Sequence, residues 1–316
     1  MKKMQLKKDV ILKYSNSTCF LLYGNRLYSI DDLEKYYFNI LANRVFDISI
    51  LDDEIYDFLV GQDLVVPFYY NHLKNDRFCK NIYFFESLLS FTERKEFTPI
   101  DFYKDICCKR VLILGCGGIG QVIIKNLLNF GVKSFVLIDG DIIDISNLNR
   151  QGFFNRKDIG KSKVETVRSY ICNHFDGIDV QVIKSYIEDV EIIKNICHKY
   201  SPDFIVNAAD HPSNIRQMIF SVAQELDIPS IFGGVGIYSG FWGPICIKNM
   251  IYKDDIFSFN NSRFSEDIIE GSISTTNNII GSFMSHDILK FWANPKDERL
   301  YLSKVISFDE YKVSLF

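Results

Sequence analysis

The sequence predicts an α/β protein in which a small N-terminal domain precedes a mainly parallel sheet covered by helices on both faces. From residue 109 onward, short apolar, β-branched segments alternate with segments whose apolar residues recur at helical spacing, a pattern typical of βαβ units. Residues 9–75 instead combine strand-like segments with acidic helices. We therefore predict two domains, residues 1–75 and residues 76–316.

The composition is that of an ordinary globular protein, with 316 residues of which 47% are hydrophobic and 24% charged. The net charge of −4 offers no electrostatic footprint for nucleic acid. The basic N-terminus leads into no signal-peptide core, and no apolar run reaches about 18 residues. These features predict a cytoplasmic protein without nucleic-acid or membrane partners.

The first domain is expected to be a compact, winged-helix-like module. Its predicted strands are residues 10–14, 19–23 and 27–30, and its predicted helices are residues 31–43 and 49–60. Both helices are rich in aspartate and glutamate, which disfavours reading of DNA. A peptide added along a sheet edge suits this surface better, because it is held by backbone hydrogen bonds. A merely structural cap on the larger domain is the alternative.

The second domain is predicted from a polar linker, aromatic helical segments around residues 83–91 and a helix after Pro99. Strands are expected at residues 109–115, 133–139, 178–184, 203–209 and 229–233, and helices at residues 118–130, 161–174, 189–200 and 213–226. A glycine-rich strand pair around residues 240–244, a polar loop at 253–271, a helix at 276–292 and strands near 300–307 and 311–315 complete the chain.

The strongest motif is the apolar run at residues 111–114, which breaks into glycines and then into a helical segment. Gly115, Gly117 and Gly120 allow a sharp turn, close approach of a phosphate, and packing of helix on strand. The helix N-terminus adds free N–H groups and a positive dipole end. Asp139, which ends the next strand, is placed to accept ribose hydroxyls. The sequence therefore predicts a Rossmann-like nucleotide-binding site.

The residues after Asp139 disfavour a dehydrogenase. Asp139-Gly-Asp141 leads into Ser146-Asn-Leu-Asn-Arg-Gln151, a polar stretch where a dehydrogenase would enter its next crossover helix. Arg150 is a planar fork suited to phosphate oxygens, and Lys163 supplies a second cation near a helix start. Two cations on phosphates suit phosphoryl chemistry.

Asp210 follows the apolar strand at residues 204–209, at the strand end where ligands of open α/β sheets bind. A carboxylate there can hold Mg²⁺ on a triphosphate. The alternative is a helix-capping aspartate beside Pro212.

Several motifs together resemble the ThiF/MoeB/ubiquitin-activating family of adenylating enzymes, over roughly residues 75–295. They are Gly115-Cys-Gly-Gly-Ile-Gly120, Asp139-Gly-Asp141, Ser146-Asn-Leu-Asn-Arg-Gln151, Lys163 and Ala209-Asp-His-Pro-Ser-Asn-Ile-Arg216. The N-terminal module, Asp210-His-Pro-Ser-Asn214, Phe241-Trp-Gly-Pro244 and Asn261-Ser-Arg-Phe264 look most like the peptide-antibiotic branch that adenylates the microcin C heptapeptide. The resemblance implies that the first domain clamps a ribosomally made precursor peptide.

The resemblance also implies site residues and a dimer. Gly115, Gly117, Gly118 and Gly120 would line the nucleotide pocket with Asp139 and Asp141, while Asn147, Arg150 and Lys163 would hold the phosphates and Asp210 would bind Mg²⁺. Family members are dimers in which an arginine from the segment before the partner's Rossmann domain reaches the γ-phosphate, and we expect a homodimer here. Arg77 is our candidate for that arginine, and Arg94 is the second choice.

The implied reaction uses ATP and Mg²⁺. A peptide carboxylate, or a deprotonated imide nitrogen, attacks the α-phosphorus and pyrophosphate leaves, without a protein nucleophile. Many relatives carry two Cys-x-x-Cys pairs that bind a structural zinc. No two of the eight cysteines here are separated by two residues, so we expect no structural zinc.

The sequence is compatible with more than one outcome of adenylation and with more than one function. The nucleotide could stay on the peptide, or adenylation could activate Asn or Glu side chains for cyclisation, as in pantocin-type maturation. A sulfur-carrier or tRNA-modifying adenylating enzyme of the same family is the second reading. A pseudoenzyme that only delivers a peptide is the third, and the presence of Arg150, Lys163 and Asp210 argues against it.

Overall fold

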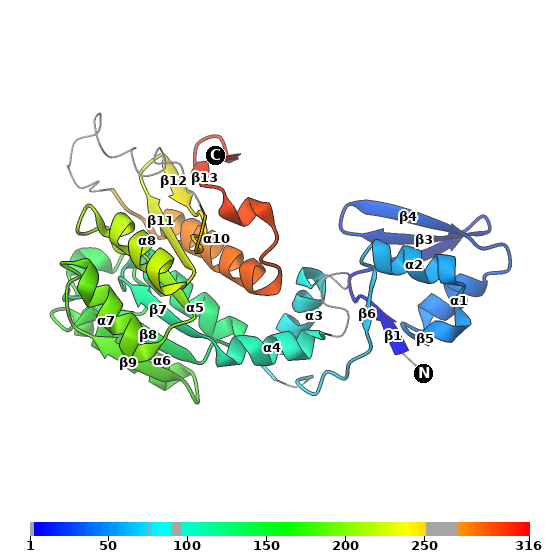
Figure 1. Ribbon diagram of the computed structural model, residues 1–316, viewed down its shortest axis with the longest axis horizontal. Helices are drawn as coiled ribbons and strands as arrows, with labels where there is room; N and C mark the ends of the chain where they lie inside the picture. Colours follow the sequence, from blue (N-terminus) through cyan, green and yellow to red (C-terminus); the bar gives the residue numbers. More distant parts are fainter. Residues whose placement is uncertain (1–2, 75, 90–96, 251–270) are drawn as a thin grey trace. The chain divides into compact units, whose positions relative to one another are not determined.

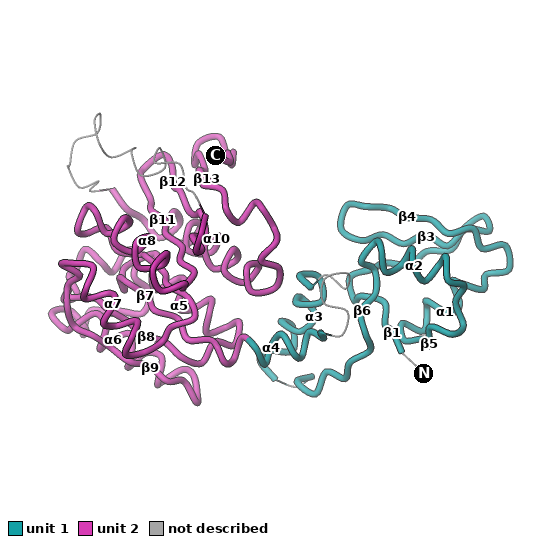
Figure 2. Tube along the Cα trace, in the orientation of Figure 1, with its two compact units in different colours: residues 1–105 teal, residues 106–316 magenta. Residues whose placement is uncertain are grey.

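The structure is a computed structural model that describes residues 3–74, 76–89, 97–250 and 271–316 (Figure 1). Arg94 and the segment 261–264 therefore lie outside the described residues. The chain divides into two compact units, Met1–Asp105 and Ile106–Phe316 (Figure 2). This division lies further along the chain than the domain boundary expected near residue 75.

The first unit holds two small antiparallel sheets. One consists of β2 (Ile11–Ser15), β3 (Thr18–Tyr23) and β4 (Arg26–Asp31), joined by tight turns, and the other has β1 (Lys3–Leu6) between β5 (Val45–Asp47) and β6 (Val65–Pro67). Asn16 and Ser17 both have positive φ, as a two-residue hairpin turn requires. The expected three strands are confirmed as β2, β3 and β4.

Helices α1 (Tyr36–Ala42) and α2 (Asp53–Gly61) pack with these sheets, and the short 3₁₀ turn η1 (Ile48–Ile50) precedes α2. The first helix begins later than the expected residue 31. Lys35 has a left-handed conformation, and the Asp32 carboxylate accepts the backbone N–H groups of Tyr37 and Phe38, which sets the start of α1.

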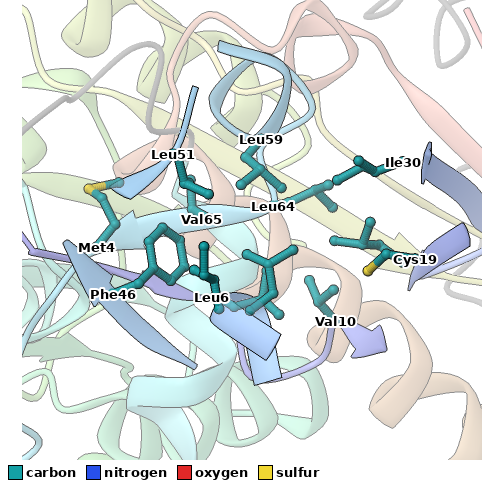
Figure 3. Packing of buried hydrophobic residues seen from close by; sticks show 13 residues of the cluster. Met4, Leu6, Val10, Cys19, Ile30, Phe46, Leu51, Leu59, Leu64 and Val65 are labelled. Atoms are coloured by element: carbon teal, nitrogen blue, oxygen red, sulfur yellow. The ribbon is translucent and has the colours of Figure 1, made fainter. Parts of the chain in front are cut away.

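The core of this unit contains side chains from both small sheets and from helices α1 and α2 (Figure 3). Met4 and Leu6 of β1, Cys19 and Leu21 of β3, and Leu59 of α2 are fully or almost fully buried. Alternate residues of β1 and β3 point inward, as the two-residue repeat of strands requires.

Helix α3 (Cys79–Leu88) belongs to the first unit because a buried polar network ties it to β1. Glu86 is fully buried and accepts hydrogen bonds from the Gln5 side chain (2.7 Å), the Tyr69 hydroxyl and the Lys8 backbone N–H (2.8 Å). The equally buried Lys7 pairs with Asp63 at 3.1 Å. Burial raises the pKa of Glu86, although its hydrogen bonds act in the opposite direction.

Helix α4 (Pro99–Cys108) follows, with Pro99 in its first turn, where a missing N–H is tolerated. Phe102 of α4 is fully buried and lies 5.1 Å from the Phe85 ring, edge to face. The compact unit therefore runs on through α3 and into α4, well beyond the predicted boundary.

The second unit is built on an eight-stranded sheet of order β14-β13-β12-β11-β10-β7-β8-β9. Its parallel strands are β7 (Arg110–Leu114), β8 (Ser134–Ile138), β9 (Asp179–Ile183), β10 (Phe204–Asn207) and β11 (Ser230–Val235), and its antiparallel strands are β12 (Ser239–Trp242), β13 (Lys304–Ser307) and β14 (Lys312–Leu315). The expected mainly parallel sheet is confirmed, with every strand close to its predicted position.

Helices cover both faces of this sheet (Figure 1). They are α5 (Gly118–Phe130), α6 (Lys163–His174), α7 (Val190–Tyr200), α8 (Ile215–Leu226) and α10 (Ser274–Ala293). Leu112, Leu114 and Ile205 face α7 and α8, whereas Phe204 contacts Phe291 and Trp292 of α10 on the other face. Among the described residues, no helix combines the length and apolarity needed to cross a bilayer.

Candidate functional site

The parallel strands end together at one edge of the sheet. The strand register places Ile138 of β8, Leu114 of β7, Asn207 of β10 and Phe232 of β11 on one rung. Asp139 and Gly115 follow directly, and Asp210 comes three residues after Asn207. Ligands of open α/β sheets bind at this edge, where neighbouring strands turn to opposite faces.

The glycine turn after β7 is tightly packed in two places and open in a third. Gly115 has φ +93°, and a Cβ there would lie 2.7 Å from the Ala208 carbonyl oxygen. A Cβ on Gly120 would lie 2.1 Å from the Gly115 carbonyl oxygen. At Gly117, the residue that caps α5, the nearest atom to such a Cβ is Gln151 Nε2 at 3.8 Å. Gly117 therefore leaves room beside the helix N-terminus, where an anion is favoured.

Gly118 serves the packing of α5 against α10. A Cβ on Gly118 would come within 2.3 Å of Asn277 Oδ1 and 3.4 Å of Arg150 Cγ. Asn277 is almost fully buried in the first turn of α10 and donates to the Ser272 hydroxyl and the Ile273 carbonyl. Sequence reasoning missed Asn277, because nothing in its neighbourhood marks it and its role comes from distant packing.

Asp139 ties the two strand ends together. Its carboxylate accepts the backbone N–H of Cys116 at 2.7 Å and that of Asp141 at 2.8 Å. A carboxylate has about four acceptor sites, so capacity remains for ribose hydroxyls. The Cys116 thiol is buried, and burial together with the Asp139 charge raises its pKa well above the usual value. Cys116 is therefore unsuited to act as a thiolate nucleophile.

Lys163 and Asp141 form an ion pair beside this turn. Lys163, the first residue of α6, is largely buried, and its Nζ lies 2.6 Å from Asp141 Oδ2. The Tyr186 hydroxyl donates to the other carboxylate oxygen at 2.9 Å. Burial alone would raise the pKa of Asp141, but the hydrogen bond and charge of Lys163, with Tyr186, lower it overall. Tyr186 was not among the predicted residues.

Arg150 and Asn147 belong to the loop after β8, which contains the 3₁₀ turn η2 (Ile145–Asn147). Asn147 Oδ1 accepts the backbone N–H of Asp144 in a capping box, which fixes the orientation of the side chain and leaves its NH2 group to donate to a phosphate. The Arg150 guanidinium donates to the Ser146 carbonyl and to Asn149 Oδ1, each at 2.9 Å. These bonds hold the guanidinium, whose stem lies near the start of α5, in a defined place.

Two buried glutamines, also absent from the predicted set, support the turn. Gln121 donates to the Cys116 carbonyl at 3.1 Å and accepts the backbone N–H of Phe153 at 2.9 Å, so it links the glycine turn to the Arg150 loop. Gln151 is 3% exposed, and its buried Oε1 accepts no hydrogen bond from any residue that the structure describes. Buried polar atoms normally have a hydrogen-bond partner. An acceptor without one, close to the open Gly117, is therefore consistent with a binding site for a polar ligand.

Asp210 is exposed beyond the end of β10, and no described residue bonds its carboxylate. Mg²⁺ commonly takes one or two carboxylates together with substrate phosphates, so Asp210 fits the predicted metal role. Among the described residues, no three His, Cys, Asp or Glu side chains gather as a metal cage. The expected lack of structural zinc stays a prediction.

Arg77 belongs to the first compact unit, and its guanidinium carbon lies 5.7 Å from the centre of the Phe78 ring. Within the second unit, the structure thus brings together the four predicted glycines, Asp139, Asp141, Asn147, Arg150 and Lys163, with Asp210 on the neighbouring strand end. The predicted action of Arg77 on a partner's site stays a prediction.

Comparison with known proteins identifies the family of this chain. Residues 92–316 match the ThiF family. The NEDD8-activating enzyme E1 catalytic subunit of Dictyostelium discoideum is 48% identical over 80 residues, which are 25% of this chain and 18% of that protein. The ubiquitin-activating enzyme E1-like protein of Saccharomyces cerevisiae is 31% identical over 146 residues, 46% of this chain and 22% of that protein. The chain spans about a fifth of the length of these relatives.

Solved structures match almost the whole chain. E. coli MccB in complex with ATP has a TM-score of 0.78 at 22% identity and covers 99% of this chain and 96% of its own. PaaA has a TM-score of 0.74 at 18% identity, with 98% of each chain covered. These likenesses establish a shared fold, including the small N-terminal part. The family match covers more than half of the sequence, and the chain belongs to the ThiF family.

Proposed function

We propose that this protein is an ATP-dependent adenylating enzyme that transfers AMP to a ribosomally made precursor peptide. One observation carries the proposal. A single sheet edge gathers the open glycine turn at Gly117, the Asp139 carboxylate, and the cations Arg150 and Lys163. Room for phosphate at a helix N-terminus, a ribose acceptor and two cations are the parts that an adenylation site needs.

The chemistry follows from charge and position. An acceptor carboxylate, or a deprotonated imide nitrogen, attacks the α-phosphorus in line, forms the new bond to it, and breaks its bond to the bridging oxygen of pyrophosphate. Arg150 and Lys163 would offset the negative charge that shifts to the phosphate oxygens. No covalent enzyme intermediate is needed, which agrees with the raised pKa of the Cys116 thiol.

Asp210 would hold the Mg²⁺ that accompanies ATP. Its exposed carboxylate leaves the metal free to keep waters and to bind phosphate oxygens, as Mg²⁺ prefers. The ion would supply charge neutralisation on the phosphates, while orientation is left to Arg150 and Lys163.

The first unit would hold the peptide. A cavity of about 450 Å³ lies between α1 and β5, lined by Tyr36, Asn39, Ile40, Asn43, Val45, Phe46, Asp47 and Ile50. Strand β5 is at a sheet edge, and β1 is its partner among the described strands. An extended peptide can pair with such an edge and place alternate side chains in the cavity. E. coli MccB, which shares the fold, has been solved with MccA, and this supports the peptide assignment.

Two further features complete the proposal. The protein would act as a homodimer in which Arg77 of one copy reaches the γ-phosphate in the other. It would act in the cytoplasm, since all eight of its cysteines are free thiols, as is usual in a reducing compartment.

The test is to incubate the protein with ATP, Mg²⁺ and the short peptides encoded beside its gene, and to follow peptide mass and pyrophosphate release. Lys163→Ala and Asp210→Ala should each lower turnover by about 10²–10³-fold, the typical effect of removing a group that stabilises transition-state charge. Lys161→Ala is the matched control, because this nearby lysine is exposed and paired with Asp158. Turnover that survives Lys163→Ala would refute the assignment.

The same assay separates the finer outcomes. A peptide that gains AMP indicates that the nucleotide is retained, whereas a loss of water indicates adenylation followed by cyclisation. The similarity to NEDD8-activating enzyme favours one second candidate, adenylation of the C-terminus of a carrier protein. That candidate predicts turnover with a ubiquitin-like or sulfur-carrier protein and none with short peptides.

A further inference from the structure

Arg216, in the first turn of α8, is partly buried between two aromatic rings. Its guanidinium carbon lies 4.4 Å from the centre of the Phe241 ring and 5.4 Å from that of Phe232. The two rings are 6.3 Å apart and inclined at 60°. Aromatic faces attract a cation most strongly where water is excluded, so the pair fixes the position of the guanidinium without using its N–H groups.

These N–H groups have no anionic partner within the described part of the chain. No hydrogen bond or ion pair joins Arg216 to a described residue, and the residues packed around it, which include Asn207, Ser230 and Cys246, bring no acidic side chain to it. Burial lowers the pKa of Arg216, and no neighbouring charge offsets this effect. A guanidinium has five donors, and donors that lose water normally find protein acceptors.

Arg110 is an arginine whose side-chain nitrogens all have partners within the folded chain, and it provides a comparison for Arg216. Its Nε donates to the Ser134 hydroxyl at 2.8 Å, one Nη donates to the Tyr200 carbonyl at 2.7 Å, and the other lies 3.6 Å from an Asp179 oxygen. Arg110 thus uses its three side-chain nitrogens in two hydrogen bonds and one ion pair within the folded chain. Arg216 instead contacts two aromatic rings, and its N–H groups are available to an acceptor from outside the described chain.

The position of Arg216 indicates which acceptor. Phe232 is on the same rung as Asn207 and Leu114, and neighbouring strands lie about 4.8 Å apart, so the Arg216 cluster lies roughly 10 Å along the edge from the glycine turn. Asp139, which would take the ribose, is on the opposite side of that turn. The end of β10, with Asp210, lies between the glycine turn and the Arg216 cluster.

We propose that Arg216, clamped between Phe232 and Phe241, binds a carboxylate of the acceptor substrate and positions the acceptor beside the nucleotide. This inference rests on the proposed function, in which the glycine turn takes the phosphates. A guanidinium pairs with the two oxygens of a carboxylate through two parallel hydrogen bonds, which give orientation as well as affinity. Arg216 is thus a positioning residue on the acceptor side of the site. A phosphate of ATP offers similar oxygens and is the other possible source of the anion.

The first arm of the test measures stability. Arg216→Met keeps an apolar stem between the rings and removes a partly buried charge that has no anionic partner among the described residues, so the melting temperature should stay the same or rise. Arg110→Met is the matched control and should lower the melting temperature, because it removes two hydrogen bonds and an ion pair of the folded chain. A comparable fall for Arg216→Met would mean that Arg216 is structural and would overturn the proposal.

The second arm measures the ligand, with N-acetylasparagine as the carboxylate probe and N-acetylasparagine amide at equal ionic strength as its control. With the wild-type protein, the carboxylate at ten times its dissociation constant should raise the melting temperature by about 3 °C or more, and the amide should not. Arg216→Met should lose this response and keep its response to ATP. No response of the wild-type protein to the carboxylate would contradict the proposal.

The two arms also separate the sources of the anion. If Arg216→Met loses the ATP response instead, Arg216 is a phosphate ligand and the proposal is wrong. If the wild-type protein responds to the carboxylate but not to ATP, the proposed adenylation fails while carboxylate binding at Arg216 stands.

Discussion

Gly120→Ala offers a direct test of how the glycine turn is built. A Cβ at this position would lie 2.1 Å from the carbonyl oxygen of Gly115, a backbone atom that no side-chain rotation can move away. Van der Waals contacts are optimal at about 3.5–4 Å. The start of α5 and the end of β7 must therefore separate by roughly 1 Å or more.

The magnitude follows from two opposing effects. Overpacking of this kind typically destabilises by about 1–3 kcal/mol, and we place this backbone clash near 3 kcal/mol. Alanine is the better helix former by about 1 kcal/mol, which offsets part of the loss because Gly120 lies within α5. The net loss of about 2 kcal/mol corresponds to a melting temperature lower by about 4–8 °C.

Two other glycines provide matched controls in the same thermal denaturation and ATP-binding assays. Gly117→Ala would contact only Gln151 Nε2 at 3.8 Å, so we expect normal stability but at least about tenfold weaker ATP binding, since the methyl group fills the approach to the helix N-terminus. Gly152→Ala has no atom within 4 Å and should change neither property. If Gly120→Ala melts with the wild type and binds ATP equally well, the account of the turn is wrong.

Two predictions concern buried charges away from the nucleotide. Burial raises the pKa of Glu86, so the folded state holds the Glu86 proton more tightly than the unfolded state does. The stabilisation from this group is therefore complete below the pKa of the unfolded state and is lost as pH rises through the pKa of the folded state. Urea denaturation should thus show stability falling from about pH 4.5 upward, and Glu86→Gln should flatten that fall; an unchanged pH profile in the variant would contradict this. The buried Asp287 carboxylate forms an ion pair with Lys304 Nζ at 3.0 Å and accepts a hydrogen bond from the indole N–H of Trp242 at 2.9 Å. Asp287→Ala should destabilise by about 3–5 kcal/mol, and adding Lys304→Met should recover most of the loss; a double variant as unstable as the single one would show that the lone buried charge is not the cause.

Much of the fold was accessible from the sequence because the signals are local. Apolar periodicity located the strands of the large sheet to within a few residues, and all of its described helices were anticipated. Strands β1, β5 and β6 were missed because each has only three or four residues and pairs at long range. The boundary near residue 75 was predicted from the change from short strands and acidic helices to a polar linker. In the structure, α3 belongs to the first unit, and its buried Glu86 is bonded to Gln5 of β1.

The residues of the site divide in the same way. The glycine turn, Asp139 and Lys163 stood out because each follows a strand or begins a helix, and Arg150 stood out in the polar stretch after β8; such positions are visible in a linear pattern. Tyr186, Gln121 and Gln151 were missed, since their roles depend on partners across the sheet edge that no spacing reveals.

What the sequence determined by itself was the class of site. Glycine chemistry and hydrophobic alternation depend on near neighbours, so the strand, turn and helix around Gly115 could be read directly from the chain. Only the tertiary structure decided that Asn277 closes on Gly118, or that Arg216 lies between Phe232 and Phe241 with its N–H groups unused by the described chain. These contacts join residues far apart in the chain, and they exist only because sheet packing brings α8, α10 and β12 to the same edge.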